Sequence, residues 1–242
     1  MCRNRNILFD SECADAFLEV FSEENFVSMS QDRFEDELWK KIPRDKRDCD
    51  FETCKGIADF FAGIVDYKSE FTGKHSLGVA KKAAELAEYM GYSQADIEKF
   101  YMAGALHDIG KMAIGNEILE KPGRLTDEEF SRMKNHAGYT YMILSEVKDF
   151  DEVRDWAALH HEKLDGTGYP FGKKAEELNE PERLMACVDI YQALTEARPY
   201  KSGMSHDKAC SILEDMVQKG WIDAAVTDKL RSCFDVGGRD MV

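Results

Sequence analysis

Apolar residues recur at helical spacing along most of this 242-residue chain, and this periodicity constrains its fold more than any other feature. Between residues 76 and 90, apolar side chains occur three and four positions apart, and the run closes on Gly91, a residue typical of helix ends. Alternation of apolar and polar residues, the pattern of a half-buried strand, is never sustained. The sequence therefore predicts an all-α protein.

Local start signals support further helices. Thr126–Glu129 has the pattern of a capping box, which opens a helix that runs through the following residues. Pro181 suits the first turn of another helix, because a proline there gives up no helical hydrogen bond. Three more helices are predicted over residues 94–106, 207–218 and 223–234.

One boundary is indicated along the chain, at the charge-dense residues 40–48. This stretch includes a proline and is typical of a linker or an exposed turn. Before it lie two short amphipathic stretches, residues 14–21 and 33–39. We therefore expect a small N-terminal helical segment, a partial regulatory region, over residues 1–55. A larger helical domain is expected over residues 56–242.

Composition limits the partners and the location of the chain. The formal net charge of -15 argues against duplex nucleic acid and anionic membranes as primary partners. No apolar run approaches the ~20 residues of a membrane span, and the first residues do not form a signal peptide. The seven cysteines are odd in number and widely spread, which favours reduced thiols over a disulfide framework. We expect a cytoplasmic protein with neither a nucleic-acid polymer nor a membrane as partner.

Five of the six histidines form one constellation with a later aspartate, in helical and apolar surroundings. These residues are His75, His107, His136, His160, His161 and Asp189. Neutral imidazole and carboxylate are the ligands that Fe(II), Mn(II) and Zn(II) accept. The pattern therefore predicts a metal site.

The first motif is the pair His107 and Asp108. Adjacent residues of a helix diverge by about 100°, so both reach one metal only near a helix end, and Gly110 places such an end here. The two oxygens of Asp108 allow it to bridge two ions, and Lys111 lies on the same side, where its ammonium could neutralise a phosphate oxygen. Taken alone, a His-Asp dipeptide is more typical of a surface pair.

The second motif is the pair His160 and His161, preceded by an apolar run. The loop that follows contains Gly166 and Gly168, which allow positive φ and a close approach of the backbone. Without the histidines this loop would be an ordinary turn.

The remaining candidates are ambiguous one by one. His75 and His136 alone are typical of structural histidines, whereas Asp189 on an apolar helix face is costly without a cation or hydrogen-bond donors. Arg198 and Lys201 form either a basic turn or a phosphate clamp.

In their order along the chain, these motifs resemble those of the HD-GYP family, HD-superfamily metal phosphohydrolases that act on cyclic dinucleotides. The matching strings are His75-Ser76, HDIGK at His107–Lys111, KPGRLT with the following His136, HHEKLDGTGYP at His160–Pro170 and VDIYQALTEARPYK at Val188–Lys201. The resemblance covers residues 56–242, and its HHE…GYP string is the most specific part. Residues 1–55 carry no motif that we can assign. Family members often have sensor or receiver modules in this region.

The resemblance implies an HD-domain helical bundle with two divalent metal ions, Fe(II) or Mn(II). One ion would be held by His75, His107, Asp108 and Asp189, and the second by Asp108, His136, His160 and His161. Asp108 and Lys111 would be catalytic. The substrate phosphates would be contacted by Lys111, Tyr169, Arg198 and Lys201.

The implied activity is hydrolysis of a cyclic dinucleotide, cyclic di-GMP or 3′3′-cyclic GMP–AMP, to a linear dinucleotide. A homodimer or a signalling-protein partner is compatible with the sequence. Some family members place a glutamate four residues before the first histidine to hold a third metal. Here that position is Phe71, and Glu70 is one residue off, so we expect two metals; further cleavage of the linear product stays open.

Two other functions remain alternatives. A catalytically weak module would bind the cyclic dinucleotide as a receptor, and an HD-fold di-iron oxygenase would oxidise its substrate. The complete ligand set argues against the receptor, and the GYP loop with its paired cations favours a phosphate substrate over an oxidation.

Overall fold

Helices are the only regular elements in the residues that the computed structural model describes, 49–68, 75–197 and 202–235. The α-helices among them are α4 (Phe51–Lys68), α5 (His75–Tyr89), α6 (Gln94–Leu106), α7 (Asn116–Leu119), α8 (Asp127–Ser145), α9 (Asp151–Ala158), α10 (Glu180–Thr195), α11 (His206–Gln218) and α12 (Ala224–Phe234). Two short 3₁₀ helices, η2 (Ile109–Ala113) and η3 (Ala175–Glu177), lie between them. These residues form no strand beyond one isolated bridge between Asp165 and Lys174. The all-α prediction is confirmed.

The local signals in the sequence have the expected effects. After α5 the chain turns at Gly91, whose φ of 82° only glycine adopts freely. The Thr126 side chain accepts a hydrogen bond from Glu129 N, and the Glu129 carboxylate accepts one from Thr126 N, which completes the capping box of α8. Pro181 lies in the first turn of α10. The predicted bounds of α5, α6, α11 and α12 agree with the structure to within one residue.

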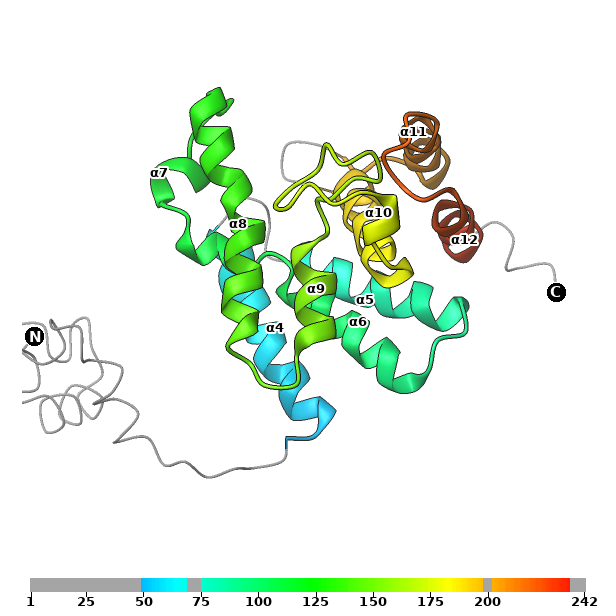
Figure 1. Cartoon of the computed structure of the whole chain (residues 1–242), viewed down its shortest axis with the longest axis horizontal. Coiled ribbons are helices and arrows are strands. Elements are labelled where there is room, and N and C mark those ends of the chain that lie inside the picture. Colours follow the sequence, from blue (N-terminus) through cyan, green and yellow to red (C-terminus); the bar gives the residue numbers. More distant parts are fainter. Residues whose placement is uncertain (1–48, 69–74, 198–201, 236–242) are drawn as a thin grey trace, which may run out of the picture. The chain divides into compact units, whose positions relative to one another are not determined.

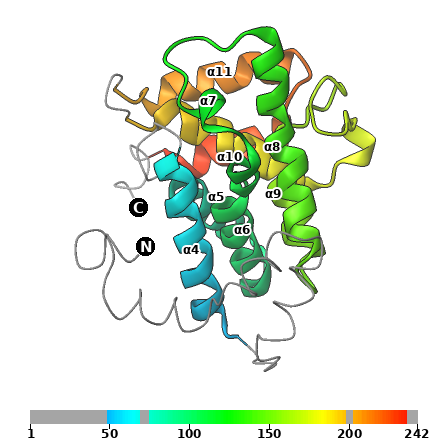
Figure 2. The same ribbon diagram turned by 90° about the vertical axis from the view of Figure 1, so that its left-hand side faces the viewer.

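The centre of the bundle is the pair α5 and α6, with α4 and α9 packed on either side of α6 (Figure 2). Helix α8 packs on α9, and α10 packs on α5. Helices α11 and α12 pack on α10 and lie on the opposite side of it from α8 (Figure 1). In the core, the Phe100 ring of α6 stacks on the Trp156 ring of α9, with the ring centroids 4.4 Å apart. Burial of such large apolar surfaces fixes how the helices cross, and thus where their polar residues meet.

Several predictions concern residues outside the described ranges. These are the stretches 14–21 and 33–39, the charged residues 40–48, and Glu70, Phe71, Arg198 and Lys201. The boundary expected after residue 55 falls within α4, and the compact unit that contains α4 begins at Cys49.

Among the described residues, no helix combines the length and the apolarity needed to cross a membrane. The two longest, α4 with 18 residues and α8 with 19, both carry charged residues. Helix α4 contains Lys55 and Asp59, which pair with each other, and α8 opens with three acidic residues.

Candidate metal centre

The predicted histidines and aspartates converge on one place in the bundle, although they come from five helical regions. His75 is the first residue of α5, His107 and Asp108 lie between α6 and η2, and His136 lies in the middle of α8. His160 and His161 follow α9 directly, and Asp189 lies within α10. The sixth histidine, His206, lies outside this site. Its Nδ1 atom is 2.9 Å from the Tyr191 hydroxyl oxygen.

One cluster consists of His75, His107 and Asp189, whose ligand atoms all lie within 4.8 Å of one another. The Oδ1 atom of Asp189 is 3.2 Å from His75 Nε2 and 3.7 Å from His107 Nε2. Metal–ligand bonds of about 2.1 Å separate neighbouring ligand atoms by about 3 Å. These spacings therefore match one ion's coordination sphere.

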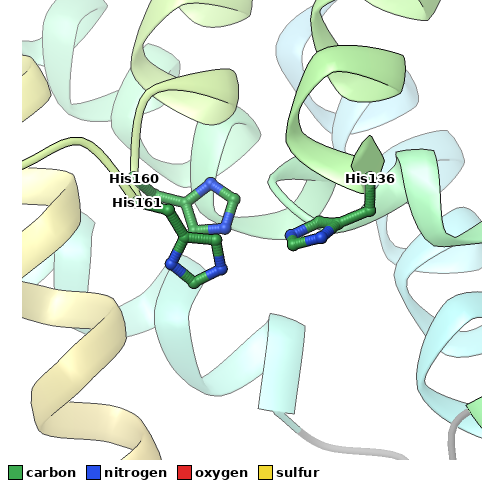
Figure 3. Close-up of side chains that lie close together, drawn as sticks. All are labelled: His136, His160 and His161. Carbon is green, nitrogen blue, oxygen red and sulfur yellow. The ribbon is translucent and has the colours of Figure 1, made fainter. Parts of the chain in front are cut away.

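A second cluster consists of His136, His160 and His161, again with ligand atoms within 4.8 Å. Figure 3 shows the His136 ring projecting from its helix toward the two rings that follow α9. The His160 and His161 rings have centroids 4.0 Å apart, and both contact the His136 ring.

Asp108 lies between the two clusters. Its Oδ2 atom is 3.3 Å from His107 Nε2, and its Oδ1 atom is 3.3 Å from His136 Nε2. The two oxygens of this buried carboxylate thus face histidines of different clusters. Such an arrangement lets one carboxylate contact two ions.

Backbone carbonyls fix the tautomers of three histidines. His107, His136 and His160 each donate from Nδ1 to the carbonyl oxygen three residues earlier, at 2.7, 2.8 and 2.6 Å respectively. A carbonyl can only accept, so Nδ1 carries a proton, and in the neutral imidazole Nε2 is left with its lone pair. Metal-ligating histidines are typically held in this way.

Two of these lone pairs point to no partner. The Nε2 atoms of His136 and His160 are buried and have no hydrogen-bond partner in the described part of the chain. His136 Nε2 approaches Asp108, as noted, but without hydrogen-bond geometry. Because buried polar atoms are almost always satisfied, these two require an explanation. A divalent cation would satisfy both, so the donor set fits a metal centre.

The pKa values of the second cluster keep its imidazoles neutral. Burial lowers the pKa of His136, holds that of His160 well below its ordinary value and lowers that of His161 to about 4. A neutral imidazole is the form that binds a metal. These side chains therefore need no deprotonation at neutral pH.

The first cluster has the opposite electrostatics. Burial alone would lower the pKa of His75, but hydrogen bonds to Asp189 and Glu196 outweigh it and raise the pKa to about 10. Burial would raise the pKa of Asp189, yet the neighbouring His75 and His107 hold it below its ordinary value. The pKa of Asp108 is also well below its usual range, because Lys111 and His107 outweigh burial. Both aspartates are thus anionic and can receive a cation.

The packing of η2 on α8 positions Asp108 near His136. A Cβ atom on Gly110 would lie 2.0 Å from the carbonyl oxygen of His136, so only glycine permits this approach. Gly110 N donates to Thr140 Oγ1 at 3.0 Å, and that hydroxyl donates to His107 O at 2.9 Å. Lys111, one residue further, donates from Nζ to Asp108 Oδ2 at 2.5 Å, on the side that helical spacing predicts.

A buried glutamate holds the loop after the His160-His161 pair. The carboxylate of Glu162 accepts hydrogen bonds from three successive backbone amides, those of Phe171, Gly172 and Lys173, at 2.7 to 3.1 Å. Gly168 packs so closely that a Cβ atom there would lie 2.4 Å from Lys163 N, as expected for a close backbone approach.

This loop carries Tyr169 to the edge of the second cluster. Its ring centroid is 4.7 Å from that of His161 and 6.3 Å from that of His136. Burial is the main reason why the pKa of Tyr169 is raised, so its hydroxyl stays protonated and can donate a hydrogen bond at neutral pH.

Three carboxylates that support the site were not predicted from the sequence. Glu162 holds the loop, Glu196 lies 3.0 Å from His75 Nδ1, and Asp66 accepts from both the backbone and the hydroxyl of Ser76 at the start of α5. Asp66 could have been found, because it is a carboxylate among apolar helix residues, as Asp189 is. Glu196 gave no such signal, since its partner is 121 residues away in the sequence.

Comparison with known families identifies the chain. A family model described as "HD domain" matches residues 59–226, which is more than half of the sequence and includes every residue of the two clusters. The chain belongs to the HD-domain family.

Relatives narrow this HD-domain protein further. A 3′3′-cGAMP-specific phosphodiesterase of Vibrio cholerae, number 1, is 38% identical over 177 residues, covering 73% of this chain and 41% of that protein. A cyclic di-GMP phosphodiesterase of Pseudomonas aeruginosa is 39% identical over 141 residues, covering 58% and 34%. The solved structure of a cyclic GMP-AMP specific phosphodiesterase of V. cholerae covers 97% of this chain and 54% of its own, at 28% identity and a TM-score of 0.53. These matches confirm the HD-GYP family. The chain spans less than half the length of the two curated relatives.

Proposed function

We propose that this HD-GYP protein is a metal-dependent phosphodiesterase that hydrolyses a cyclic dinucleotide, cyclic di-GMP or 3′3′-cyclic GMP–AMP, to a linear dinucleotide. The observation that carries the proposal is the position of Asp108, whose two oxygens each lie 3.3 Å from a histidine of a different cluster. The activities of the relatives support the substrate class. In this proposal residues 56–242 are the catalytic domain, and residues 1–55 are an N-terminal segment.

Two divalent ions would complete the centre. His75, His107 and Asp189 would hold one, His136, His160 and His161 the other, and Asp108 would contact both. Nitrogen and carboxylate donors without thiolate favour iron or manganese. When bound, a pair of such ions supplies Lewis-acid activation of water and offsets charge on a phosphodiester.

The protein's own side chains would orient and neutralise the substrate. Burial alone would lower the pKa of Lys111, but the adjacent Asp108 outweighs this effect. The pKa is therefore raised, and the ammonium persists at neutral pH. It would offset the negative charge that develops on the phosphate being cleaved. The protonated Tyr169 hydroxyl would donate to a phosphate oxygen. Arg198 and Lys201 remain the predicted contacts of the second phosphate.

Product analysis with both cyclic dinucleotides tests this proposal. Protein loaded anaerobically with Fe(II), or with Mn(II), should release a linear dinucleotide, and Asp108→Ala should lose bound metal and at least about 10³-fold in rate, several kcal/mol of transition-state stabilisation. Asp228→Ala, at an exposed position of α12, is the matched control and should behave as wild type. Undiminished hydrolysis by Asp108→Ala would refute the assignment.

The same assay separates the alternatives. Tight binding of the cyclic dinucleotide by metal-loaded protein without any linear product would identify a receptor. Oxygen consumption with a candidate alcohol, and no phosphodiester cleavage, would identify an oxygenase. A homodimer is a further proposal, and a measurement of the protein's mass in solution tests it.

A further inference from the structure

His75 differs from His107, His136 and His160 in what holds its Nδ1 atom. The Nδ1 atoms of His107, His136 and His160 are bound by neutral backbone carbonyls, whereas His75 Nδ1 lies 3.0 Å from Glu196 Oε2. The side chain of Glu196 is only 9% exposed, so water screens this contact little. A buried carboxylate thus takes the place that a peptide oxygen has elsewhere.

The position of His75 in the fold explains the difference. The carbonyl three residues before a helical histidine belongs to the preceding turn of the same helix. Helix α5 begins at His75, so no turn of α5 precedes this ring. Another element has to hold its Nδ1 atom.

Helix α10 and the residue that follows it provide both hydrogen-bond partners of the His75 ring. Asp189 lies within this helix, and Glu196 follows its last residue, seven positions further on. Seven residues are about two helical turns, so both carboxylates are on the same side of α10. Asp189 Oδ1 is 3.2 Å from Nε2 and Glu196 Oε2 is 3.0 Å from Nδ1, which fixes the ring in its plane.

The charge of the partner has a chemical consequence. A carboxylate on Nδ1 orients the imidazole and also increases the electron density at Nε2, which strengthens the bond to a metal. A charge-assisted hydrogen bond is also roughly twice as strong as a neutral one. Nε2 faces Asp189 and the ring of His107, and it would bind the ion in place of its proton.

We propose that Glu196 is a positioning residue that secures the metal ion of the His75–His107–Asp189 cluster and leaves the ion of the His136–His160–His161 cluster unaffected. This inference rests on the proposed two-metal function. It predicts an asymmetry: one of the two ions depends on Glu196. Removing the carboxylate should weaken that ion by about 10- to 100-fold, the usual effect of losing such an outer partner.

Titration of the full chain with Mn(II), followed calorimetrically, tests the asymmetry without any substrate. Wild-type protein should bind two ions. Glu196→Gln should weaken one site and leave the other at wild-type affinity, and Glu196→Ala should weaken the same site at least as much. The matched control is Glu88→Gln, an exposed position on α5, which should leave both sites unchanged.

The outcomes distinguish the inference from the proposed function. If wild-type protein binds two ions and the Glu196 variants bind both with unchanged affinity, the role of Glu196 is refuted and the two-metal proposal stands. Equal weakening of both sites also refutes it, because a general structural role would act that way. If wild-type protein binds fewer than two ions, the two-metal proposal itself fails. Circular dichroism monitors folding, and Glu196→Gln, nearly equal in shape, carries the test if Glu196→Ala does not fold.

Discussion

Gly110→Ala should separate the two clusters without changing any ligand. The new Cβ atom would lie 2.0 Å from His136 O and 2.5 Å from Thr140 N, both in the backbone of α8. Ordinary van der Waals contact begins near 3.4 Å, about 1.4 Å more than the 2.0 Å between this Cβ atom and His136 O. Helices η2 and α8 must therefore move apart by about that distance. Overpacking of this kind costs about 1–3 kcal/mol of stability. A displacement near 1 Å at a reacting centre costs about 10²-fold in rate.

The assay combines thermal unfolding, Mn(II) binding and hydrolysis of cyclic di-GMP on the same sample. We expect a folded protein with about 10²-fold slower turnover, because Asp108 moves away from His136. Gly56→Ala is the control: a Cβ atom there meets nothing within 4 Å, so this substitution in α4 should stabilise by about 0.5–1 kcal/mol and leave turnover unchanged. Wild-type turnover by a stably folded Gly110→Ala would refute the claim that the approach of η2 to α8 sets the centre.

Other predictions concern pH and the loop. In metal-free protein His161 has a pKa of about 4 when folded and about 6.5 when unfolded, so the free energy of unfolding should fall as the pH drops from 6.5 to 4. The loss should be less than about 3 kcal/mol, because His161 is partly exposed. Urea unfolding at a series of pH values should show a smaller loss for His161→Gln. His75, with its pKa raised to about 10, contributes stability below pH 6.5 that is lost as pH rises toward 10, and an alkaline limb unchanged in His75→Gln would contradict this sign. Glu162→Gln removes the negative charge to which three backbone amides donate, so we expect the free energy of unfolding to fall by about 1–3 kcal/mol and KM to rise. Faster amide hydrogen exchange should be confined to residues 171–173.

The helices could be predicted from the sequence because their signals are local. The bounds of α6 and the capping box of α8 depend on residues a few positions apart, and the structure has both as predicted. Asp189 was also recognisable, since a carboxylate among apolar helix residues needs a partner whatever the fold.

Contacts between distant segments could not be predicted in the same way. That Gly110 has to be glycine depends on how η2 crosses α8, which no local pattern encodes. Glu196 reads as an ordinary residue after a helix, and its role appears only when α10 crosses α5 at His75. The packing of the core decides these crossings, so the supporting residues of the site emerge with the tertiary structure. The assignment of each ligand to an ion rests on the family resemblance and stays a prediction.

Anomalous diffraction from crystals loaded with Mn(II) tests the central claim most directly. We expect two strong peaks about 3.5–4 Å apart, one beside His75, His107 and Asp189 and one beside His136, His160 and His161, with Asp108 in contact with both. A single peak, or two ions that share no carboxylate, would contradict it.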